Sequence, residues 1–223
     1  MDIIKQNTVP AENQMANSSE VSFLGNKDAK MRILVVGNSI TRHGPCEEIG
    51  WYGDWGMAAS TSEKDFVHRL YAKIKDGGKD AYMCIRQCAF WERNYLLDNI
   101  LNNYNDEKKF NAGVIIFRLG ENVEEKNKPF FEESAGKFIG YLKGAKTKVI
   151  FTTCFWKNKV VDDAIRDISN KNNYSCIELG DLGDDSEMRA TGQFEHSGVA
   201  AHPSDKGMEN IAERIYGHLR DYL

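Results

Sequence analysis

The chain has 223 residues, of which 41% are hydrophobic, and its formal net charge at pH 7 is -4. This length suits one domain that can bury a full core without disulfides or metal ions. The lysines and arginines are scattered along the sequence, so nucleic-acid binding, which requires a basic surface, is not expected.

No segment suits a membrane or a secretory leader. No window holds about 18 consecutive apolar residues, as a membrane-spanning helix requires. Residues 1–14 lack the charged and apolar regions of a signal peptide. The five cysteines are odd in number and form no C-x-x-C pair, which favours free thiols in a reducing compartment. We therefore expect a cytoplasmic protein.

Residues 1–30 are polar and weakly periodic, with clusters of Asn, Ser and Lys, so we expect a tail or an irregular lead-in. From residue 31 onward, short apolar runs alternate with helical patterns. The expected strands are 32–36, 80–85, 113–119, 147–153 and 174–179, and the expected helices are 62–75, 92–103, 129–143, 161–168 and about 206–220.

This alternation predicts right-handed βαβ units and a parallel sheet. We expect residues 31–223 to form a three-layer α/β/α sandwich of the flavodoxin-like type, with about five parallel strands. Ligands bind such sheets at the carboxyl ends of the strands. Chemistry is therefore expected in the loops that follow the five predicted strands.

The first of these loops reads Gly37-Asn38-Ser39-Ile40-Thr41. A serine here can present its hydroxyl to the crevice, but it needs an adjacent base to act as a nucleophile. The segment is not a G-x-S-x-G elbow, because Thr41 stands where the second Gly should be, and it is not a P-loop. A serine that caps a helix after a turn is the alternative interpretation.

Two later loops carry polar residues that fit acyl-transfer chemistry. Asn122 follows the third strand in Gly120-Glu121-Asn122, where its amide could donate to an oxyanion or could simply belong to a turn. His202 lies before Pro203 and the last helix. Histidine is the usual general base near neutral pH, although a lone loop histidine can equally be a surface residue.

The order of these three loops resembles the SGNH hydrolase superfamily of GDSL-like esterases. Its members carry a G-D-S-like block near the N-terminus, a G-x-N-D-like block in mid-chain and a D-x-x-H-like block near the C-terminus. The resemblance covers residues 31–223. It implies that Ser39 is the nucleophile and His202 the general base. It also implies that the Asn122 side chain and the Ser39 backbone N–H hold the oxyanion, and that no metal or organic cofactor is needed.

The chain departs from the family pattern at three places. Asn38 replaces the Asp before the nucleophile, a mild change because an amide still hydrogen-bonds locally. The glycine after the second strand is missing, so the backbone N–H of Cys88 or Ala89 would have to serve in the oxyanion hole. Val199 stands three residues before His202, where relatives carry the carboxylate that orients the base.

Another group must then hold His202 in the correct tautomer. A backbone carbonyl would give a Ser–His dyad, as in some carbohydrate-esterase relatives. Asp205 is the alternative, although its position also suits the N-cap of the last helix. A carbonyl-held imidazole lacks the anion that would raise its pKa, so we expect activity to rise with pH in one step near about 6.5.

Further residues could contribute to a substrate site. His43 lies four residues after Ser39 and is also a rival base, as is His196 to a lesser degree. Trp51 and Trp55 fall in a Gly-rich segment, GWYGDWG, where aromatic rings can either stack on sugars or pack as a plug under the loop. Trp91 and Glu92 open the helix after the second strand and could reach the crevice.

Together these residues predict hydrolysis of a small acyl ester through an acyl-enzyme, with an O-acetylated carbohydrate as one candidate substrate. A lipid or thioester acylhydrolase is the enzymatic alternative. The alternative of a different class is a non-catalytic carbohydrate- or acyl-binding module derived from such an enzyme. The expected partner is a small-molecule ester, with neither nucleic acid nor membrane.

Overall fold

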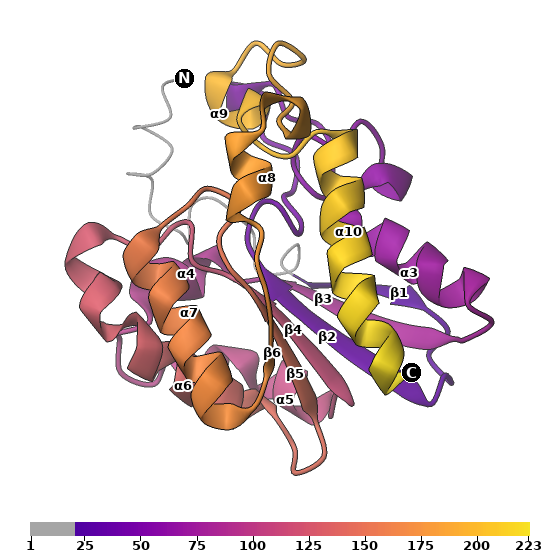
Figure 1. Cartoon of the computed structure of the whole chain (residues 1–223), viewed down its shortest axis with the longest axis vertical. Coiled ribbons are helices and arrows are strands. Elements are labelled where there is room, and N and C mark those ends of the chain that lie inside the picture. Colours follow the sequence, from indigo (N-terminus) through magenta and orange to yellow (C-terminus); the bar gives the residue numbers. More distant parts are fainter. Residues whose placement is uncertain (1–20) are drawn as a thin grey trace.

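The computed structural model describes residues 21–223 and places a six-stranded sheet between two layers of helices (Figure 1). The strands are β1 Val21–Gly25, β2 Met31–Gly37, β3 Ala81–Gln87, β4 Val114–Arg118, β5 Lys148–Thr152 and β6 Ser175–Ile177. Their order across the sheet is β1-β3-β2-β4-β5-β6. All neighbours are parallel except β1 and β3. The predicted α/β fold with a flavodoxin-like parallel sheet is confirmed.

Strand β1 differs from the expectation of an irregular lead-in. Val21–Gly25 pair with the outer edge of β3 and add a sixth, antiparallel strand. Phe23 lies on Tyr82 with the ring centroids 5.3 Å apart, so the strand gains aromatic packing as well as backbone hydrogen bonds. The part of the predicted lead-in before residue 21 lies outside the described residues.

The central strands are buried on both faces, which explains their continuous apolar sequences. In β2, Leu34 and Val36 face one core, whereas Ile33 and Val35 face the other. All four side chains have no exposed surface. The run therefore shows no alternation between polar and apolar residues.

The helices flank this sheet unequally. They are α3 Phe66–Asp76, α4 Ala89–Asn94, α5 Asn105–Lys109, α6 Phe131–Leu142, α7 Lys159–Asn172, α8 Gly180–Asp184, α9 Ser197–Ala200 and α10 Asp205–Leu219. Helices α3 and α10 cover one face, and α4 to α7 cover the other (Figure 1). Within residues 21–223, no helix has the length and apolar character needed to cross a membrane.

The predicted helix over 92–103 is interrupted. Helix α4 ends at Asn94, and a separate 3-10 turn follows over Ile100–Tyr104. Asn99 between them adopts a left-handed conformation with φ of 61°, which an α-helix cannot continue through. The apolar periodicity spans both pieces, so the pattern alone predicts one helix.

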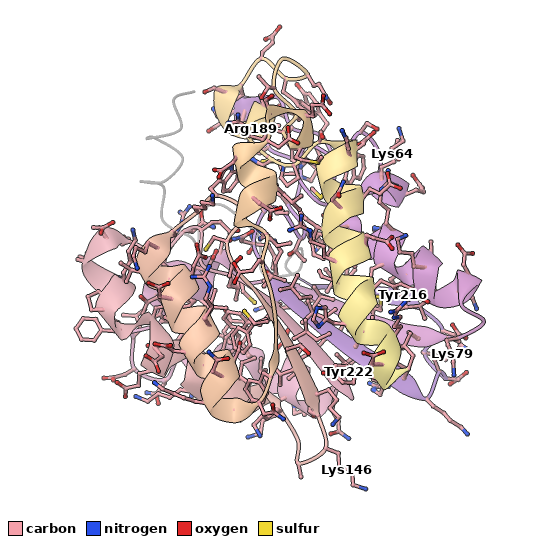
Figure 2. All side chains as sticks on the ribbon, in the orientation of Figure 1. Lys64, Lys79, Lys146, Arg189, Tyr216 and Tyr222 are labelled. Atoms are coloured by element: carbon pink, nitrogen blue, oxygen red, sulfur yellow. The ribbon has the colours of Figure 1, made fainter. Side chains whose placement is uncertain are left out.

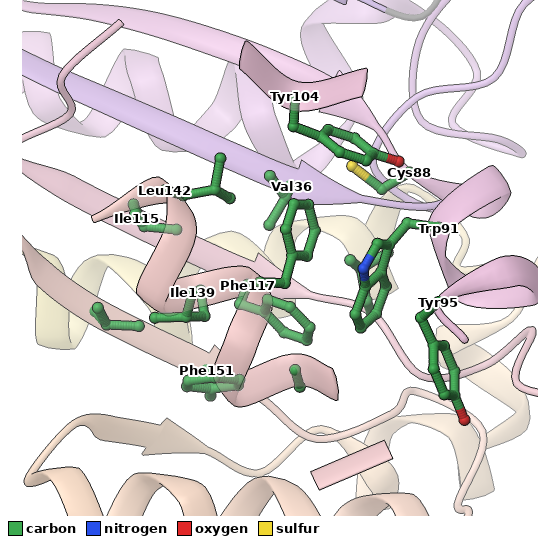
Figure 3. Close-up of a cluster of buried hydrophobic side chains, with 14 of the residues drawn as sticks. Val36, Cys88, Trp91, Tyr95, Tyr104, Ile115, Phe117, Ile139, Leu142 and Phe151 are labelled. Atoms are coloured by element: carbon green, nitrogen blue, oxygen red, sulfur yellow. The ribbon is translucent and has the colours of Figure 1, made fainter. Parts of the chain in front are cut away.

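Helix α4 is fixed by an aromatic core (Figure 3). The Trp91 ring stacks on Phe138 at 4.8 Å and meets Phe117 edge-on at 5.9 Å. Trp91 is 1% exposed, so α4 has little freedom to rotate. The neighbouring Glu92 is thereby held against the residues that follow β4.

The carboxyl ends of the parallel strands face the end of the molecule that carries α8, α9 and the start of α10 (Figure 1). Lys64 and Arg189 mark this end, and Lys146, which precedes β5, marks the other (Figure 2). The Lys64 ammonium pairs with Asp205 at the first residue of α10. The predicted chemical loops therefore meet at one end of the sheet.

Candidate active site

Ser39 lies on a tight turn directly after β2. The N–H groups of Thr41 and Arg42 both donate to the Asn38 carbonyl oxygen, at 2.9 and 3.0 Å. Gly37 allows this turn, because a Cβ there would lie 1.8 Å from Thr41 Oγ1. The turn leaves Ser39 partly exposed between two buried neighbours. Its hydroxyl is therefore presented at the carboxyl end of the sheet.

The structure brings Ser39 and His202 together. Ser39 Oγ lies 2.8 Å from His202 Nε2, and His202 Nδ1 lies 2.6 Å from the Gly198 carbonyl oxygen. A carbonyl oxygen can only accept, so Nδ1 carries the ring proton in the neutral imidazole. Nε2 is then the acceptor and faces the Ser39 hydroxyl. This tautomer suits a general base.

Helix α9 supplies that carbonyl. His196 caps the helix, because its Nδ1 accepts from the N–H groups of Gly198 and Val199 at 3.1 and 3.3 Å. Val199 has no exposed surface and packs in a small apolar cluster with Trp51 and Met57. Position 199, where SGNH hydrolases carry a carboxylate, is therefore part of a hydrophobic core, and His196 acts as a helix cap.

Asp205 lies away from the imidazole. Its carboxylate accepts from the Ser60 N–H and the Ser60 hydroxyl, both at 2.8 Å, and pairs with Lys64 at 2.9 Å. The expectation that it caps α10 is wrong, because Ser204 occupies the N-cap and accepts from Gly207 N–H. The alternative in which Asp205 orients His202 has no contact to support it.

Burial is the main influence on the pKa of His202. It lowers the pKa of His202 to about 3, and the carbonyl of Gly198 opposes the shift in part. The positive charge of nearby Arg118 lowers the pKa further. The imidazole is thus neutral at ordinary pH. The sequence alone predicts that activity rises near the unperturbed histidine pKa. With the lowered pKa of His202, we expect this rise at a lower pH.

Trp156 is a neighbour of His202 that the sequence analysis missed. Its ring meets the His202 ring edge-on at 5.0 Å, and its indole N–H donates to the Ala201 carbonyl at 3.1 Å. The residue lies in the loop after β5, at the edge of the sheet where chemistry is expected. Its place in the loop after a predicted strand was the one signal that could have identified it, since a lone Trp in a loop belongs to no motif.

A buried polar network lies under the Ser39 turn. Asn38, Glu92 and Arg118 have no exposed surface. Arg118 Nη1 donates to Asn38 Oδ1 at 2.6 Å, and its guanidinium also pairs with Glu121. Asn38 Nδ2 donates to Glu121 Oε2 at 2.6 Å and to Glu92 Oε1 at 3.1 Å. The Asn38 amide therefore both accepts a hydrogen bond, at Oδ1, and donates hydrogen bonds, from Nδ2. Its position next to Ser39 in the sequence only partly suggests this linking role.

Glu92 connects this network to Asn122. Its Oε2 accepts from Asn122 Nδ2 at 2.7 Å, and its Oε1 accepts from Gly120 N–H at 2.5 Å. Burial and the neighbouring Glu121 raise the pKa of Glu92, against the effect of these donors. Gly120 has a φ of +146°, and a Cβ there would lie 2.6 Å from Val161. The loop after β4 is thereby held in one conformation.

The structure corrects the expected backbone oxyanion donors after β3. The Cys88 N–H donates to the Gly37 carbonyl at 2.6 Å, which extends the β2–β3 pairing. The Ala89 N–H donates to Gln87 Oε1 at 2.9 Å. Both groups are therefore occupied. The Ser39 N–H, in contrast, has no acceptor among residues 21–223.

The predicted aromatic substrate residues are mostly structural. Trp51 is 3% exposed, lies edge-on to Trp55 at 5.7 Å, and donates its indole N–H to the His43 carbonyl. Trp55 is partly buried and donates to the Ala59 carbonyl at 2.8 Å. These contacts support the packed plug and leave Trp51 no face for a sugar.

His43 is placed differently from His202. Its Nδ1 lies 2.6 Å from the carbonyl oxygen of Gly44, and burial lowers its pKa. The Ser39 hydroxyl instead donates its hydrogen bond to His202 Nε2. His43 is therefore a neutral neighbour of the site, and nothing in its contacts supports the role of rival base. Within residues 21–223, no group of His, Cys, Asp and Glu side chains is arranged to hold a metal ion.

Comparison with known proteins finds likeness in structure but not in sequence. No family model matches the chain, and no curated protein matches it. The crystal structure of TesA shares 14% identity and a TM-score of 0.54, over 86% of this chain and 100% of its own. A GDSL-like lipase from Parabacteroides merdae shares 12% identity and a TM-score of 0.58, over 89% and 99%.

A third solved structure is a family two carbohydrate esterase from Clostridium thermocellum in complex with cellohexaose. It shares 14% identity and a TM-score of 0.55, over 89% of this chain and 67% of its own. At identities this low, the structural similarity establishes the fold only. The activity must be argued from the residues of the site. The chain therefore has the fold of GDSL-like lipases and family two carbohydrate esterases, which is the fold of the SGNH hydrolases.

Proposed function

We propose that the protein is a serine esterase that hydrolyses a small acyl ester, with Ser39 as nucleophile and His202 as general base. The observation that carries the proposal is the 2.8 Å contact between Ser39 Oγ and His202 Nε2. The base is itself oriented by the Gly198 carbonyl. A nucleophile, a base and an orienting group within hydrogen-bond reach are the arrangement that nucleophilic catalysis requires.

The reaction then proceeds in two steps. Ser39 Oγ attacks the acyl carbon while His202 Nε2 takes the hydroxyl proton, and the proton then passes to the departing alcohol oxygen. Water subsequently attacks the acyl-enzyme and its proton goes to His202 Nε2. The bond between Ser39 Oγ and the acyl carbon then breaks, His202 returns the proton to Ser39 Oγ, and the acid leaves. His202 is neutral before each attack because burial lowers its pKa.

The oxyanion is held by two groups in this scheme. One is the Ser39 N–H, which has no acceptor within the described part of the chain. The other is the Asn122 amide, which spends one N–H on Glu92 and has a second to donate. Loss of one preorganised donor typically lowers kcat by about 10²–10³.

An O-acetylated carbohydrate is the substrate we favour. Glu121, Lys128, Trp156 and Asn158 line a hollow of about 400 Å³, and the Trp156 ring also contacts His202. A partly exposed indole among polar groups suits a sugar better than an acyl chain. The similarity in fold to an esterase that binds cellohexaose supports the same choice. Lipid esters and acyl thioesters are the competing substrates.

Turnover of p-nitrophenyl acetate tests the activity. We expect hydrolysis by the wild-type protein and a loss of at least about 10³-fold in Ser39→Ala, because the attacking atom is removed. Ser186→Ala, at an exposed serine, is the matched control and should keep full activity. Comparing acetylated xylan, long-chain esters and acyl thioesters then ranks the substrates. Equal rates for wild type and Ser39→Ala would refute the proposal.

A non-catalytic binding module is favoured by one observation. The backbone N–H groups of Cys88 and Ala89 are both engaged, so the oxyanion hole has fewer donors than the family pattern implies. A protein without turnover that still binds acetylated oligosaccharides in calorimetry would support this candidate. Turnover dependent on Ser39 would exclude it.

A further inference from the structure

Glu92 is a buried carboxylate that the proposed reaction does not use. It has no exposed surface, and three donors converge on it, from Gly120, Asn38 and Asn122. We propose that Glu92 is the positioning residue of the oxyanion hole: its carboxylate fixes the orientation of the Asn122 amide. The inference rests on the proposed esterase function, because that function gives Asn122 its role.

The hydrogen-bond pattern decides the orientation. An ionised carboxylate accepts and cannot donate, so the neighbouring amide must present its NH₂ group to Glu92 Oε2. The observed contact, from Asn122 Nδ2 at 2.7 Å, agrees with this requirement. The rotated amide would bring Asn122 Oδ1 against Glu92 Oε2, and two acceptors would then face each other. The second N–H of Asn122 is thereby fixed in direction.

The charges around Glu92 indicate that it serves more than packing. Of the cations nearby, Arg118 pairs with Glu121, and Arg93 interacts with Glu92 through its charge. The hydrogen bonds to Glu92 come from neutral donors, while burial and Glu121 raise its pKa. A buried carboxylate whose hydrogen-bond donors are neutral is costly, and an apolar residue of similar volume would cost less. Such groups concentrate at functional sites.

Replacing Glu92 by glutamine should invert the Asn122 amide. Gly120 N–H and Asn38 Nδ2 both point at Oε1, so the single oxygen of a glutamine is best placed there. Its NH₂ group then occupies the place of Oε2 and requires an acceptor. Asn122 can supply one only by turning Oδ1 toward residue 92. The substitution Glu92→Gln keeps the shape of the side chain but changes the direction in which the Asn122 amide donates.

Four variants test the proposal: Glu92→Gln, Asn122→Ala, the double variant, and Glu107→Gln as a control. Glu107 is the matched control because its side chain is 4% exposed and pairs with Arg86 outside the site. We expect Glu92→Gln and Asn122→Ala each to lower kcat by about 10²-fold or more, with KM nearly unchanged. The double variant should be no slower than Asn122→Ala, and Glu107→Gln should keep the wild-type kcat.

A spectroscopic reading does not depend on turnover. The side-chain ¹⁵N–¹H pair of Asn122, assigned by its disappearance in Asn122→Ala, should shift in Glu92→Gln and stay in place in Glu107→Gln. If Glu92→Gln fails to fold, Glu92→Asp carries the test, because it keeps an acceptor-only group. Its loss of kcat, too, should vanish in the Asn122→Ala background.

The outcomes separate this inference from the proposed function. If Asn122→Ala is slow but Glu92→Gln stays within threefold of wild type, or if their losses multiply in the double variant, the positioning role is wrong and the esterase stands. If the wild type has no turnover, the proposed function fails, and an unshifted Asn122 amide in Glu92→Gln would then refute the orientation as well.

Discussion

The backbone oxygen of Gly198 lies 2.6 Å from Nδ1 of His202. In a Ser-His-Asp triad this position belongs to a carboxylate, which fixes the tautomer and stabilises the imidazolium. A carbonyl can fix the tautomer but carries no full charge. The His202 imidazole is therefore well oriented, but its charged form is less strongly stabilised than the imidazolium of such a triad.

Introducing at Val199 the carboxylate that SGNH hydrolases carry should destabilise the protein rather than raise its activity. Val199 is fully buried with Trp51 and Met57, so an aspartate there would be an unpaired charge in an apolar cluster. We expect Val199→Asp to lower the free energy of unfolding by about 3 kcal/mol or more. Urea denaturation measures this loss. Val199→Asn separates charge from shape, and a stable, faster Val199→Asp enzyme would contradict our account of the helix.

The pH profile of kcat/KM should extend to acid pH. Activity needs neutral His202, and burial lowers its pKa to about 3, so the neutral form persists as pH falls below the ordinary value. His202 is partly exposed. We therefore expect the acid limb between about 3 and 6.5, the lowered and the unperturbed values. Stopped-time assays with p-nitrophenyl acetate check this, and an inflection at or above 6.5 would show that an anion stabilises the imidazolium.

Trp51 should matter for stability and not for substrate affinity. It is 3% exposed and packs against Trp55 and Val199. Trp51→Ala is expected to cost about 3–5 kcal/mol in the free energy of unfolding. Tyr52→Ala, at a neighbouring ring that is 71% exposed, should cost little. A raised KM for acetylated sugars in a stably folded Trp51→Ala protein would instead support stacking on the substrate.

Much of the fold was predictable because its signals are local. The apolar run of β2 and the loop after it follow from strand periodicity and from the position of Ser39. The edge strand over Val21–Gly25 was missed because its stabilisation comes from pairing with β3, which sequence periodicity does not record. The helix predicted over 92–103 is interrupted at Asn99, which adopts a left-handed backbone conformation. The spacing of apolar residues does not reveal such a conformation.

The site was predictable where a motif carried it. Ser39, Asn122 and His202 were singled out from three short loops, whereas Arg118 and Glu121 were given no role and Trp156 was missed. A charged residue at the end of an apolar strand, as Arg118 is, was an available signal. The occupied N–H groups at Cys88 and Ala89 could not be foreseen, because they depend on partners in three dimensions.

Asp205 should anchor a loop without taking part in catalysis. Its carboxylate binds Ser60 and Lys64, and these bonds lower its pKa despite partial burial. The anchoring is therefore present at neutral pH and lost as pH falls through the lowered value. Asp205→Asn should cost about 1 kcal/mol in the free energy of unfolding, since the group is partly exposed. Its kcat should stay within about threefold of wild type, whereas a loss near 10⁴ would mean that Asp205 orients His202.

The most direct test of the account is the rate and site of labelling by a fluorophosphonate, read by mass spectrometry of the digested protein. The account predicts one label, on Ser39, that is absent in Ser39→Ala. It also predicts that labelling slows by at least about 10²-fold in His202→Ala, because the base and the nucleophile act as a unit. A label on another serine, or an unchanged rate in His202→Ala, would contradict the assignment of Ser39 and His202 as the catalytic pair.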